Sequence, residues 1–377
     1  MGRFLPDPIR LRAIARKEAI QLRRDTRSLL LAFILPLILL VIFGYAITWD
    51  VKNIPFAVCD QAHSRESRDL ITTFQSSGYF TLIETLEDPS DIADRLFRRK
   101  ELIAFVIPPD FSRDLAAGRP AKLQAIVDGS DANTATIAIG YTQAIVQSVA
   151  ARAQVTAVRM TTPVRSQSRI WFNEDLKSRN MIVPGLVAVI MMIIAAILTS
   201  LTIAREWERG TMEQLASTPV TRLEVVLGKL LPYLAIGLID VTASSVLGVI
   251  LYGVPFRGSP ALLMVLSFFF LVGALGLGIF ISAFARTQLL ATQVAMLATF
   301  LPAYLLSGFM FAISAMPPAL RLVTYLVPAR YFLVVTRGIF LKGVGAHVLA
   351  RQGAAMVIFS AIGLFLAVRT FRKELRP

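Results

Sequence analysis

One carboxylate, Asp240, lies inside a long apolar stretch of this 377-residue sequence, interrupting the otherwise charge-free run Leu230–Phe256. An acid within an apolar helix of that length is costly unless it pairs with a partner or binds a ligand. Asp240 is therefore either a proton or cation site, or a structural acid paired with a hydroxyl such as Thr242 or Ser244 or with a partner helix. Both interpretations stay open, although a proton-driven carrier usually shows more than one such group.

The motifs of common enzymatic and nucleotide-binding chemistries are missing from the sequence. The nearest string to a phosphate-binding loop, Gly228-Lys229-Leu230, lacks both the upstream glycine and the hydroxyl residue. A single cysteine, Cys59, excludes a disulfide within the chain, and two histidines, His63 and His347, disfavour a histidine-built metal site. The sequence thus predicts no metal or cofactor bound by this chain and no enzymatic activity of its own.

Residues 205–222 combine both signs of charge with apolar side chains, and Gly210 and Pro219 divide the segment. Charges interleaved with Trp207 and Leu215 are typical of a short amphipathic helix that binds a partner. A solvated connector is the alternative, but it would not need these two apolar residues. The segment is interpreted as a polar loop that presents a docking element.

Apolar stretches of membrane length decide the fold class. Charge-free runs of 22 to 34 residues occupy Ser28–Trp49, Met181–Ala204, Gly258–Ala285 and Thr287–Leu320. A bilayer core about 30 Å thick needs roughly 20 apolar helical residues. With a mean hydropathy of +0.63 and only 17% charged residues, the sequence predicts a membrane α-helical protein.

Six transmembrane helices are predicted, the first at 28–49 and the other five within 180–370. These five lie at Met181–Ala204, Leu230–Phe256, about Ala261–Ala285, 287 to about Ile313, and Gly353–Val368. Between the last two, prolines and arginines interrupt residues 315–342 too often for one crossing helix, so two re-entrant half-helices are expected there. Residues 371–377 form a short tail.

Two segments outside these helices have distinct patterns. Residues 1–27 read as a basic amphipathic helix on the membrane surface, with Leu11, Ile14, Ala15 and Leu22 near one face. Residues 50–179 hold equal numbers of acidic and basic residues, and short β-like runs alternate with helical ones, which predicts an α/β domain inserted between the first two spans. Its strands are expected at Ile54–Cys59, Phe80–Thr85, Leu102–Ile107 and Leu123–Val127.

The distribution of positive charge predicts the orientation. With both termini inside, the cytoplasmic pieces carry seventeen Lys and Arg residues and the short outer pieces carry six. This bias favours cytoplasmic termini and an extracytoplasmic α/β domain, and it accounts for the net charge of +14 without nucleic acid. Six cations are many for the outer side, so either the cluster at 321–342 is functional or one segment is assigned to the wrong side of the membrane.

Two strings resemble a known family specifically. Glu208-Arg-Gly-Thr-Met-Glu-Gln-Leu-Ala-Ser-Thr-Pro-Val220 resembles the first cytoplasmic loop of type-2 ABC exporter permeases, in the bacterial multidrug-type branch with a large extracytoplasmic domain. Pro328-Ala-Arg-Tyr-Phe332 with Arg337-Gly-Ile-Phe340 resembles its re-entrant region. Weaker matches follow in the family's order over nearly the whole chain, at 105–111, 127–131, 181–185, 307–309 and 316–318. The chain departs from the pattern at Trp171-Phe-Asn-Glu174, where proline is expected after asparagine.

The resemblance implies a multi-pass permease subunit of the bacterial inner membrane with both termini cytoplasmic. Such a subunit moves a drug, lipid or other amphiphile outward, using ATP that is bound and hydrolysed by separate cytosolic ABC ATPase subunits. A second permease copy or a sister permease completes the membrane dimer, and membrane lipid and a periplasmic adaptor are further expected partners. The outer domain either recognises substrate or passes it to the adaptor. The substrate and the choice between homodimer and heterodimer stay open.

The resemblance also implies roles for particular residues. The Pro317, Pro328, Arg330, Tyr331 and Arg337 side chains would line or gate the outer exit. The residues that would couple the chain to its ATPase are Arg205, Glu206, Glu208, Arg209, Gly210, Thr211, Glu213, Gln214, Leu215, Thr218 and Pro219.

Two other classes are the main rivals to an exporter. An ion-gradient-driven carrier would use Asp240 and would not need a docking segment. A membrane-anchored enzyme would need at least two convergent acid–base or nucleophilic groups, whereas Asp240 is the only acid within a span. A sensor is disfavoured because the cytoplasmic pieces are too small for an output domain.

Overall fold

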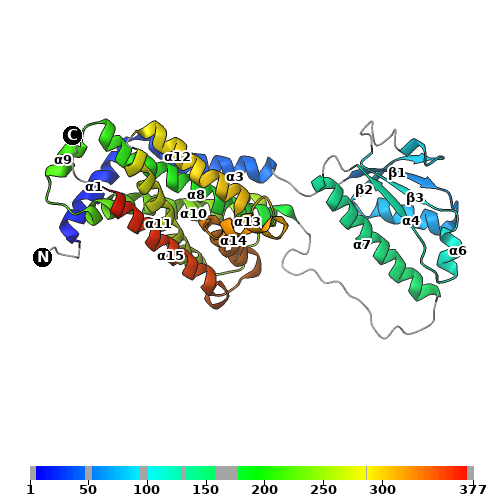
Figure 1. The fold of residues 1–377 in the computed structure, drawn as a ribbon. Helices are drawn as coiled ribbons and strands as arrows, with labels where there is room; N and C mark the ends of the chain where they lie inside the picture. Colours follow the sequence, from blue (N-terminus) through cyan, green and yellow to red (C-terminus); the bar gives the residue numbers. More distant parts are fainter. Residues whose placement is uncertain are drawn as a thin grey trace. The chain divides into compact units, whose positions relative to one another are not determined.

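The computed structural model describes residues 6–46, 53–92, 101–128, 132–157, 177–285 and 287–371. The chain divides into two compact units (Figure 1). Unit 1 comprises Met1–Thr48 and Ile170–Pro377, and unit 2 comprises Trp49–Arg169. The described residues of unit 1 form helices and the loops that join them, whereas unit 2 contains a β-sheet.

Unit 1 is built from helices of very different length. Its amino-terminal helices are α1 (Pro8–Arg24), α2 (Thr26–Leu29), a π-helical turn (Leu30–Ile34) and α3 (Leu35–Ala46). The long helices are α8 (Ser178–Glu208), α10 (Arg222–Tyr252), α11 (Pro260–Ala285), α12 (Gln288–Leu301, extended by a π-helical turn at Pro302–Leu306) and α15 (Ala346–Thr370). The short helices are α9 (Met212–Ser217), α13 (Pro318–Thr324) and α14 (Pro328–Arg337, extended by a π-helical turn at Gly338–Lys342).

Five helices in the described part of the chain are long and apolar enough to cross a membrane, or up to six if one bent pair is a span. These five overlap the last five spans expected from the sequence, but α10 runs from Arg222 to Tyr252 rather than over Leu230–Phe256, and α15 begins at Ala346 rather than Gly353. The first expected span, 28–49, corresponds to the shorter apolar helix Leu30–Ala46, and its last residues lie outside the described ranges. The expected end of the fifth span at Ile313 is wrong, because the helix ends at Leu306 and Gly308 then adopts a φ of +87°.

The predicted polar loop at 205–222 is also shorter than expected. Helix α8 continues through Glu208, and α10 already begins at Arg222, where Thr221 and Glu224 form a capping box. Charged residues extend α8 here because they find partners on α1 and α10. Non-helical backbone is confined to residues 209–211 and 218–221, and Gly210 has the positive φ, +69°, that this tight turn uses.

Close contacts between small residues set the order of the long helices. A Cβ atom on Gly276 of α11 would lie 2.7 Å from the Gly363 carbonyl carbon of α15, and one on Gly278 would lie 2.5 Å from the Ala196 carbonyl oxygen of α8. Such contacts let helix backbones approach closely in an apolar medium, where packing rather than water drives association. The three helices run parallel, so their carboxyl-terminal ends lie together with α1 and α9 at one end of unit 1 (Figure 1).

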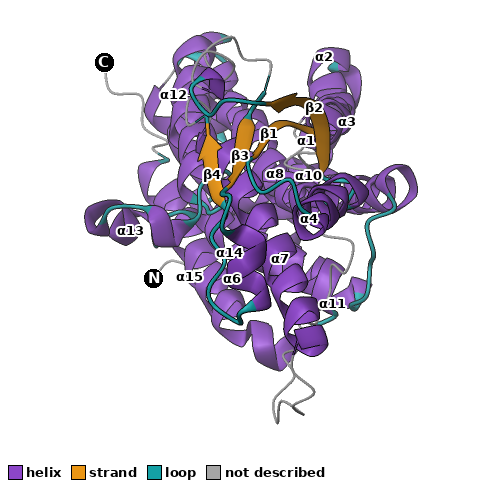
Figure 2. Cartoon of the chain, turned by 90° about the vertical axis from the view of Figure 1, so that its right-hand side faces the viewer, coloured by secondary structure: helices purple, strands orange, loops and turns teal. Residues whose placement is uncertain are grey.

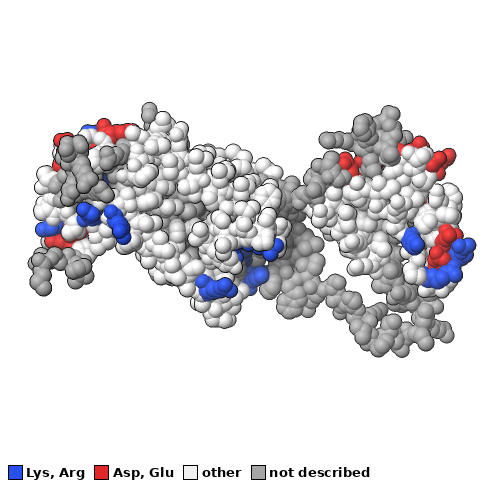
Figure 3. Space-filling model, viewed as in Figure 1, with Lys and Arg blue, Asp and Glu red and all other residues white. Residues whose placement is uncertain are grey.

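The charged residues of unit 1 are distributed unevenly along the direction of its long helices. On the face shown in Figure 3, the Lys, Arg, Asp and Glu residues of unit 1 gather at its two ends, and the surface between them is uncharged. This band matches the apolar middle of the five long helices and is the pattern expected of a surface that meets hydrocarbon.

Helices α13 and α14, the latter with its π-helical extension, form the bent pair, with an angle of 78° between them. The far end of this pair lies beside the turn between α10 and α11, where the Arg257 amide donates to the Phe340 carbonyl at 3.0 Å. Arg337 Nε donates to the Met181 carbonyl near the start of α8 at 3.2 Å. Both contacts lie at the end of unit 1 opposite α9. The re-entrant arrangement itself stays a prediction, because the bent pair is either a broken span or a re-entrant loop.

Unit 2 contains one four-stranded sheet in the order β2-β1-β3-β4 (Figure 2). The strands are β1 (Ile54–Asp60), β2 (Phe80–Leu86), β3 (Ile103–Ile107) and β4 (Gln124–Val127), each within one residue of its predicted range. Strands β1 to β3 are parallel and β4 is antiparallel to β3. Helices α4 (Arg65–Ser76), α6 (Phe111–Ala116) and α7 (Ala132–Ala157) contribute to a core on one face of the sheet, around Phe56, Phe74 and Phe105.

The single cysteine, Cys59, is buried in strand β1 with only 1% of its surface exposed. Its thiol donates to the Glu87 carbonyl at 3.7 Å. Burial, assisted by the negative charges of Asp88 and Asp60, raises the pKa of the thiol. Cys59 is therefore inaccessible, and little of its thiol is in the reactive thiolate form. Labelling of this thiol in the native protein would not show on which side of the membrane unit 2 lies.

We predict that Cys59 in the native protein reacts with a maleimide at least about tenfold more slowly than the same thiol in the denatured chain, because both access and thiolate fraction are reduced. Mass spectrometry after timed labelling measures this rate. The matched control is Gln61→Cys in a Cys59→Ala background, since position 61 is exposed. Equal rates for native Cys59 and this control would contradict the buried placement.

Candidate functional site

A buried cluster of charges joins three helices at the α9 end of unit 1. Lys229 of α10 lies 3.0 Å from a Glu18 carboxylate oxygen of α1 and 3.2 Å from a Glu206 carboxylate oxygen of α8. All three side chains are nearly inaccessible, since the residues are between 2% and 4% exposed. The Tyr233 hydroxyl, one turn along α10 from Lys229, donates to Glu18 at 3.3 Å. We call Glu18, Glu206, Lys229 and Tyr233 the buried charge cluster.

The cluster extends toward the surface through Glu206. Lys17 Nζ lies 2.8 Å from Glu206 Oε1, and its side chain is about half exposed. The Thr211 hydroxyl, which precedes α9, donates to Glu206 Oε2. Glu206 therefore connects the start of α9 to α1 and α10 at once.

Helix α1 fits against α10 because Gly228 leaves room for it. A Cβ atom there would lie 2.6 Å from the Ile14 side chain. Near the start of α1, the Asp7 amide donates to Glu224 Oε1 at 2.8 Å. Near its end, Asp25 pairs with Arg205 of α8 at 2.8 Å. Contacts at both ends and in the middle thus hold α1 against the helices that flank α9.

An exposed polar surface surrounds α9. Met212 is 3% exposed and anchors the short helix, and Leu215 is half-buried. The exposed side is formed by Arg209, Gly210, Glu213, Gln214, Thr218 and Pro219, which we call the α9 surface. A rigid base with an exposed polar face is what docking to another protein requires.

The structure separates the eleven coupling residues predicted from the sequence. The exposed ones other than Glu208 lie on the α9 surface, whereas Glu206 is buried and Arg205 is largely covered beside Asp25. A docked partner therefore cannot reach Glu206 in this conformation. Glu208 is exposed, but it accepts hydrogen bonds from the Gln288 amide at 2.7 Å and from the Gln288 side chain. Glu208 thus links the end of α8 to the first residue of α12.

Sequence reasoning missed Glu18 and Lys229. Glu18 lies on the same helical face as Leu11, Ile14, Ala15 and Leu22, where an acid is out of place on an apolar stripe. Lys229 directly precedes the apolar run that begins at Leu230. Two charges of opposite sign at apolar positions were the signal in the sequence that could have predicted this ion pair.

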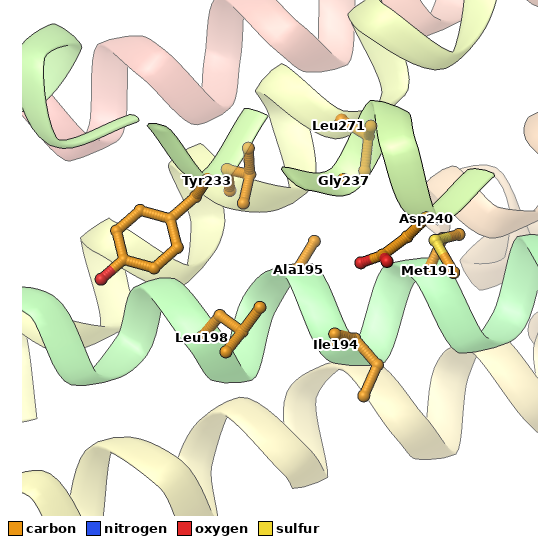
Figure 4. A pocket seen from close by; sticks show the side chains of 9 residues that line it. Met191, Ile194, Ala195, Leu198, Tyr233, Gly237, Asp240 and Leu271 are labelled. Atoms are coloured by element: carbon orange, nitrogen blue, oxygen red, sulfur yellow. The ribbon is translucent and has the colours of Figure 1, made fainter. Parts of the chain in front are cut away.

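Asp240 is buried, at 2% exposure, beside a cavity of about 10 Å³ between α8, α10 and α11. That volume admits about one water molecule. Figure 4 shows its carboxylate directed from α10 toward α8, beside Met191 and Ala195. The expected pairing with a nearby hydroxyl is not found, because Thr242 donates to the Leu238 carbonyl instead and the buried Ser244 hydroxyl makes no hydrogen bond.

The predicted exit residues divide between two places. Pro317 precedes α13 and Pro328 begins α14. Within this pair of helices, the Arg330 guanidinium lies 3.9 Å from the Tyr325 ring centroid, and the Tyr331 hydroxyl donates to the Tyr325 carbonyl at 2.9 Å. Arg337 instead reaches the start of α8. Among the described residues, no group of His, Cys, Asp and Glu side chains could hold a metal ion.

Comparison with known proteins gives consistent matches over most of the chain. The sequence profile of the ABC-2 family transporter proteins matches residues 27–369. The chain is 41% identical over 346 residues to the probable multidrug ABC transporter permease YbhS of Escherichia coli K12, covering 89% of each chain. It is 31% identical over 370 residues to the probable multidrug ABC transporter permease YbhR of the same strain, covering 97% of this chain and 99% of YbhR.

A more distant match reaches a eukaryotic protein. ABC transporter G family member 20 of Dictyostelium discoideum is 22% identical over 370 residues, covering 96% of this chain but only 50% of that longer protein.

We predict that Lys229→Met lowers the free energy of unfolding by about 3–5 kcal/mol, because it leaves two buried carboxylates without their cation. The matched control, Lys17→Met, removes a half-exposed partner of the same Glu206 and is expected to cost about 1 kcal/mol or less. Unfolding of the purified chain in mixed micelles measures both values.

A triple variant, Glu18→Gln, Glu206→Gln and Lys229→Met, keeps this prediction testable if Lys229→Met alone does not fold. Neutralising all three buried charges is expected to recover much of the lost stability. Equal costs for the Lys229 and Lys17 variants would contradict the buried charge cluster.

Proposed function

The chain belongs to the ABC-2 family of transporter proteins and is an ABC transporter permease, and on that premise we propose that it exports its substrate using ATP hydrolysed by a separate ABC ATPase docked on the α9 surface. Family membership implies association with an ABC ATPase subunit and dimerisation. Permease homologues and apolar helices support a multi-pass protein of the bacterial inner membrane. The chain itself is a transport subunit rather than an enzyme.

The observation that carries this proposal is the combination of an exposed α9 surface with the buried charge cluster beneath it. Helix α9 has only six residues, and it joins the two 31-residue helices α8 and α10. Because Glu206 and Lys229 fix these helices to each other and to α1, a displacement of α9 moves all of them together. A partner that changes shape on binding or hydrolysing ATP would thereby bias two arrangements of the helices.

Hydrogen bonds offer a route from α8 into the apolar middle of the unit. Thr199 of α8 donates to the Leu275 carbonyl of α11 at 3.0 Å. The Ile203 and Ala204 amides of α8 both donate to Ser282 of α11 at 2.9 Å. In our proposal, these bonds make α11 follow α8.

An aromatic contact continues this route toward the opposite end. Phe270 of α11 stacks on Phe332 of α14, with ring centroids 4.2 Å apart. Motion of α11 would therefore reach the pair α13 and α14. The proposed exit function of Arg330, Tyr331 and Arg337 follows from this connection.

The relatives' names suggest the substrate class. YbhS and YbhR are named as probable multidrug permeases, so we propose a drug-like amphiphile as the substrate. The proposed orientation places both termini and α9 in the cytoplasm, and unit 2 and helices α13 and α14 outside. In this arrangement unit 2 contacts substrate or a periplasmic adaptor, and a second copy or a sister permease completes the dimer.

We predict that Glu213→Lys reduces substrate-coupled ATP hydrolysis of the reconstituted transporter about tenfold, because charge reversal in the middle of a docking interface typically costs more than 1 kcal/mol. Glu213 is preferred over Glu208, since loss of Glu208 would also release the start of α12. The assay compares ATP hydrolysis and vesicle transport at matched protein levels.

The matched control is Glu87→Lys, the same change at an exposed position in unit 2. Both variants should retain the thermal stability of the wild type. Undiminished coupling in Glu213→Lys, or an equal loss in Glu87→Lys, would remove the α9 surface from the docking role.

Asp240 separates the proposed exporter from an ion-driven carrier. We predict that Asp240→Asn, which keeps the volume but removes the charge, leaves ATP-driven transport at the wild-type level. An ion-driven carrier would lose transport with this variant, because its coupling ion or proton would have no site. Transport into inverted vesicles, with ATP or with a pH gradient alone, distinguishes the two outcomes.

A further inference from the structure

A large groove opens between α1, α8 and the start of α12. Its volume is about 730 Å³, which is within the range of small-molecule binding sites. Four cations line it, Lys17, Arg24, Arg205 and Arg209, with one carboxylate, Asp25. Since Asp25 is paired with Arg205, the groove retains an excess of positive charge.

The cations face the groove from two elements. Lys17 and Arg24 extend from α1, and Arg205 and Arg209 extend from the last turn of α8 and the residue after it. The carboxylates of Glu18 and Glu206 balance the charges of Lys229 and Lys17, so the excess positive charge of the groove comes from Arg24 and Arg209. Arg24 and Arg209 are exposed to solvent. Because cations extend into the groove from both α1 and the end of α8, they form a concave cationic site rather than a flat basic surface.

The groove also has an apolar side. Its lining includes Leu31 of the π-helical turn, Leu201 of α8 and Ile20 of α1. Leu31 is 38% exposed and Ile20 is 41% exposed. One groove therefore offers cations to an anionic group and apolar side chains to a hydrocarbon chain.

The position of the groove along the helices matches the boundary between lipid headgroups and acyl chains. The charge-free stretch of α8 ends at Ala204, directly before Arg205. Gln288, which also lines the groove, is the first residue of α12. The apolar residues of the first expected span begin at Leu29, after Arg24 and Asp25. Three segments thus change from polar to apolar at this level.

We propose that this groove binds an anionic membrane phospholipid, with the headgroup phosphate held by Arg24 and Arg209 and an acyl chain lying along Leu31 and Leu201. Guanidinium groups match phosphate oxygens in geometry and charge. The arrangement of cations above apolar side chains fits an amphiphile of the bilayer better than a soluble phosphate. Lipid binding here does not require the proposed export activity, and because Arg209 also belongs to the α9 surface the two sites adjoin.

Binding to the full chain alone, without an ATPase, tests the proposal. Native mass spectrometry of the purified protein would be titrated with dioleoyl-phosphatidylglycerol and with dioleoyl-phosphatidylcholine, which has the same acyl chains and no net charge. We expect the anionic lipid to bind about tenfold more tightly, since each Lys or Arg near an anionic lipid surface contributes about 1 kcal/mol. Arg24→Gln with Arg209→Gln should reduce its affinity to that of phosphatidylcholine.

Two further variants separate a defined site from general attraction. Arg16→Gln with Arg23→Gln removes the same charge from exposed positions of α1 that do not line the groove, and it should leave the preference intact. Gln21→Trp fills the groove without changing any charge, and it should weaken binding of the anionic lipid. It also keeps the proposal testable if the double arginine variant fails to fold, as judged by thermal unfolding.

Three results would overturn the proposal. Equal losses in the two double variants would show diffuse attraction by a basic surface. Unchanged binding in Gln21→Trp would place the lipid elsewhere. Displacement of the lipid by equimolar glycerol phosphate would show that a soluble phosphate, rather than a lipid, is the ligand that the groove recognises.

Discussion

The arrangement of unit 1 at its α9 end depends on one buried cation. Lys229 lies between the carboxylates of Glu18 and Glu206, and all three residues are nearly inaccessible to water. Moving isolated charges out of water is so costly that each of these groups needs the others in place. The cluster therefore fixes α1, α8 and α10 in one mutual arrangement. Nonspecific apolar packing alone would allow these helices to slide past one another.

The same constraint explains how a six-residue helix could transmit force. Helix α9 buries little surface of its own, but Thr211 and Met212 tie it to the fixed helices around the cluster. Small residues at Gly276, Gly278 and Gly363 then bring α8, α11 and α15 into close contact. Tight packing of this kind favours discrete arrangements over continuous deformation, as a transporter that alternates between two states requires.

The sequence predicted the elements better than their connections. Long charge-free runs located the apolar helices, and alternating patterns located all four strands of unit 2 to within one residue. The predicted ends of helices were wrong where tertiary contacts override local composition. Arg205 and Glu206 continue α8 because Asp25 and Lys17 pair with them. The local sequence pattern placed the residues of the α9 surface in one segment, but it could not distinguish these exposed residues from the buried Glu206 and the covered Arg205. Pairing between Glu18 and Lys229 is invisible along the chain, because 211 residues separate them.

Crosslinking from the α9 surface tests the central claim most directly. Gln214→Cys, in a Cys59→Ala background, would carry a photoreactive group in cells, and mass spectrometry would identify what it captures. We predict capture of a separate ATP-binding protein from position 214, and none from the exposed position 61 of unit 2. Capture of no ATP-binding protein at position 214, in a chain that still transports, would contradict the proposal that α9 receives the work of ATP hydrolysis.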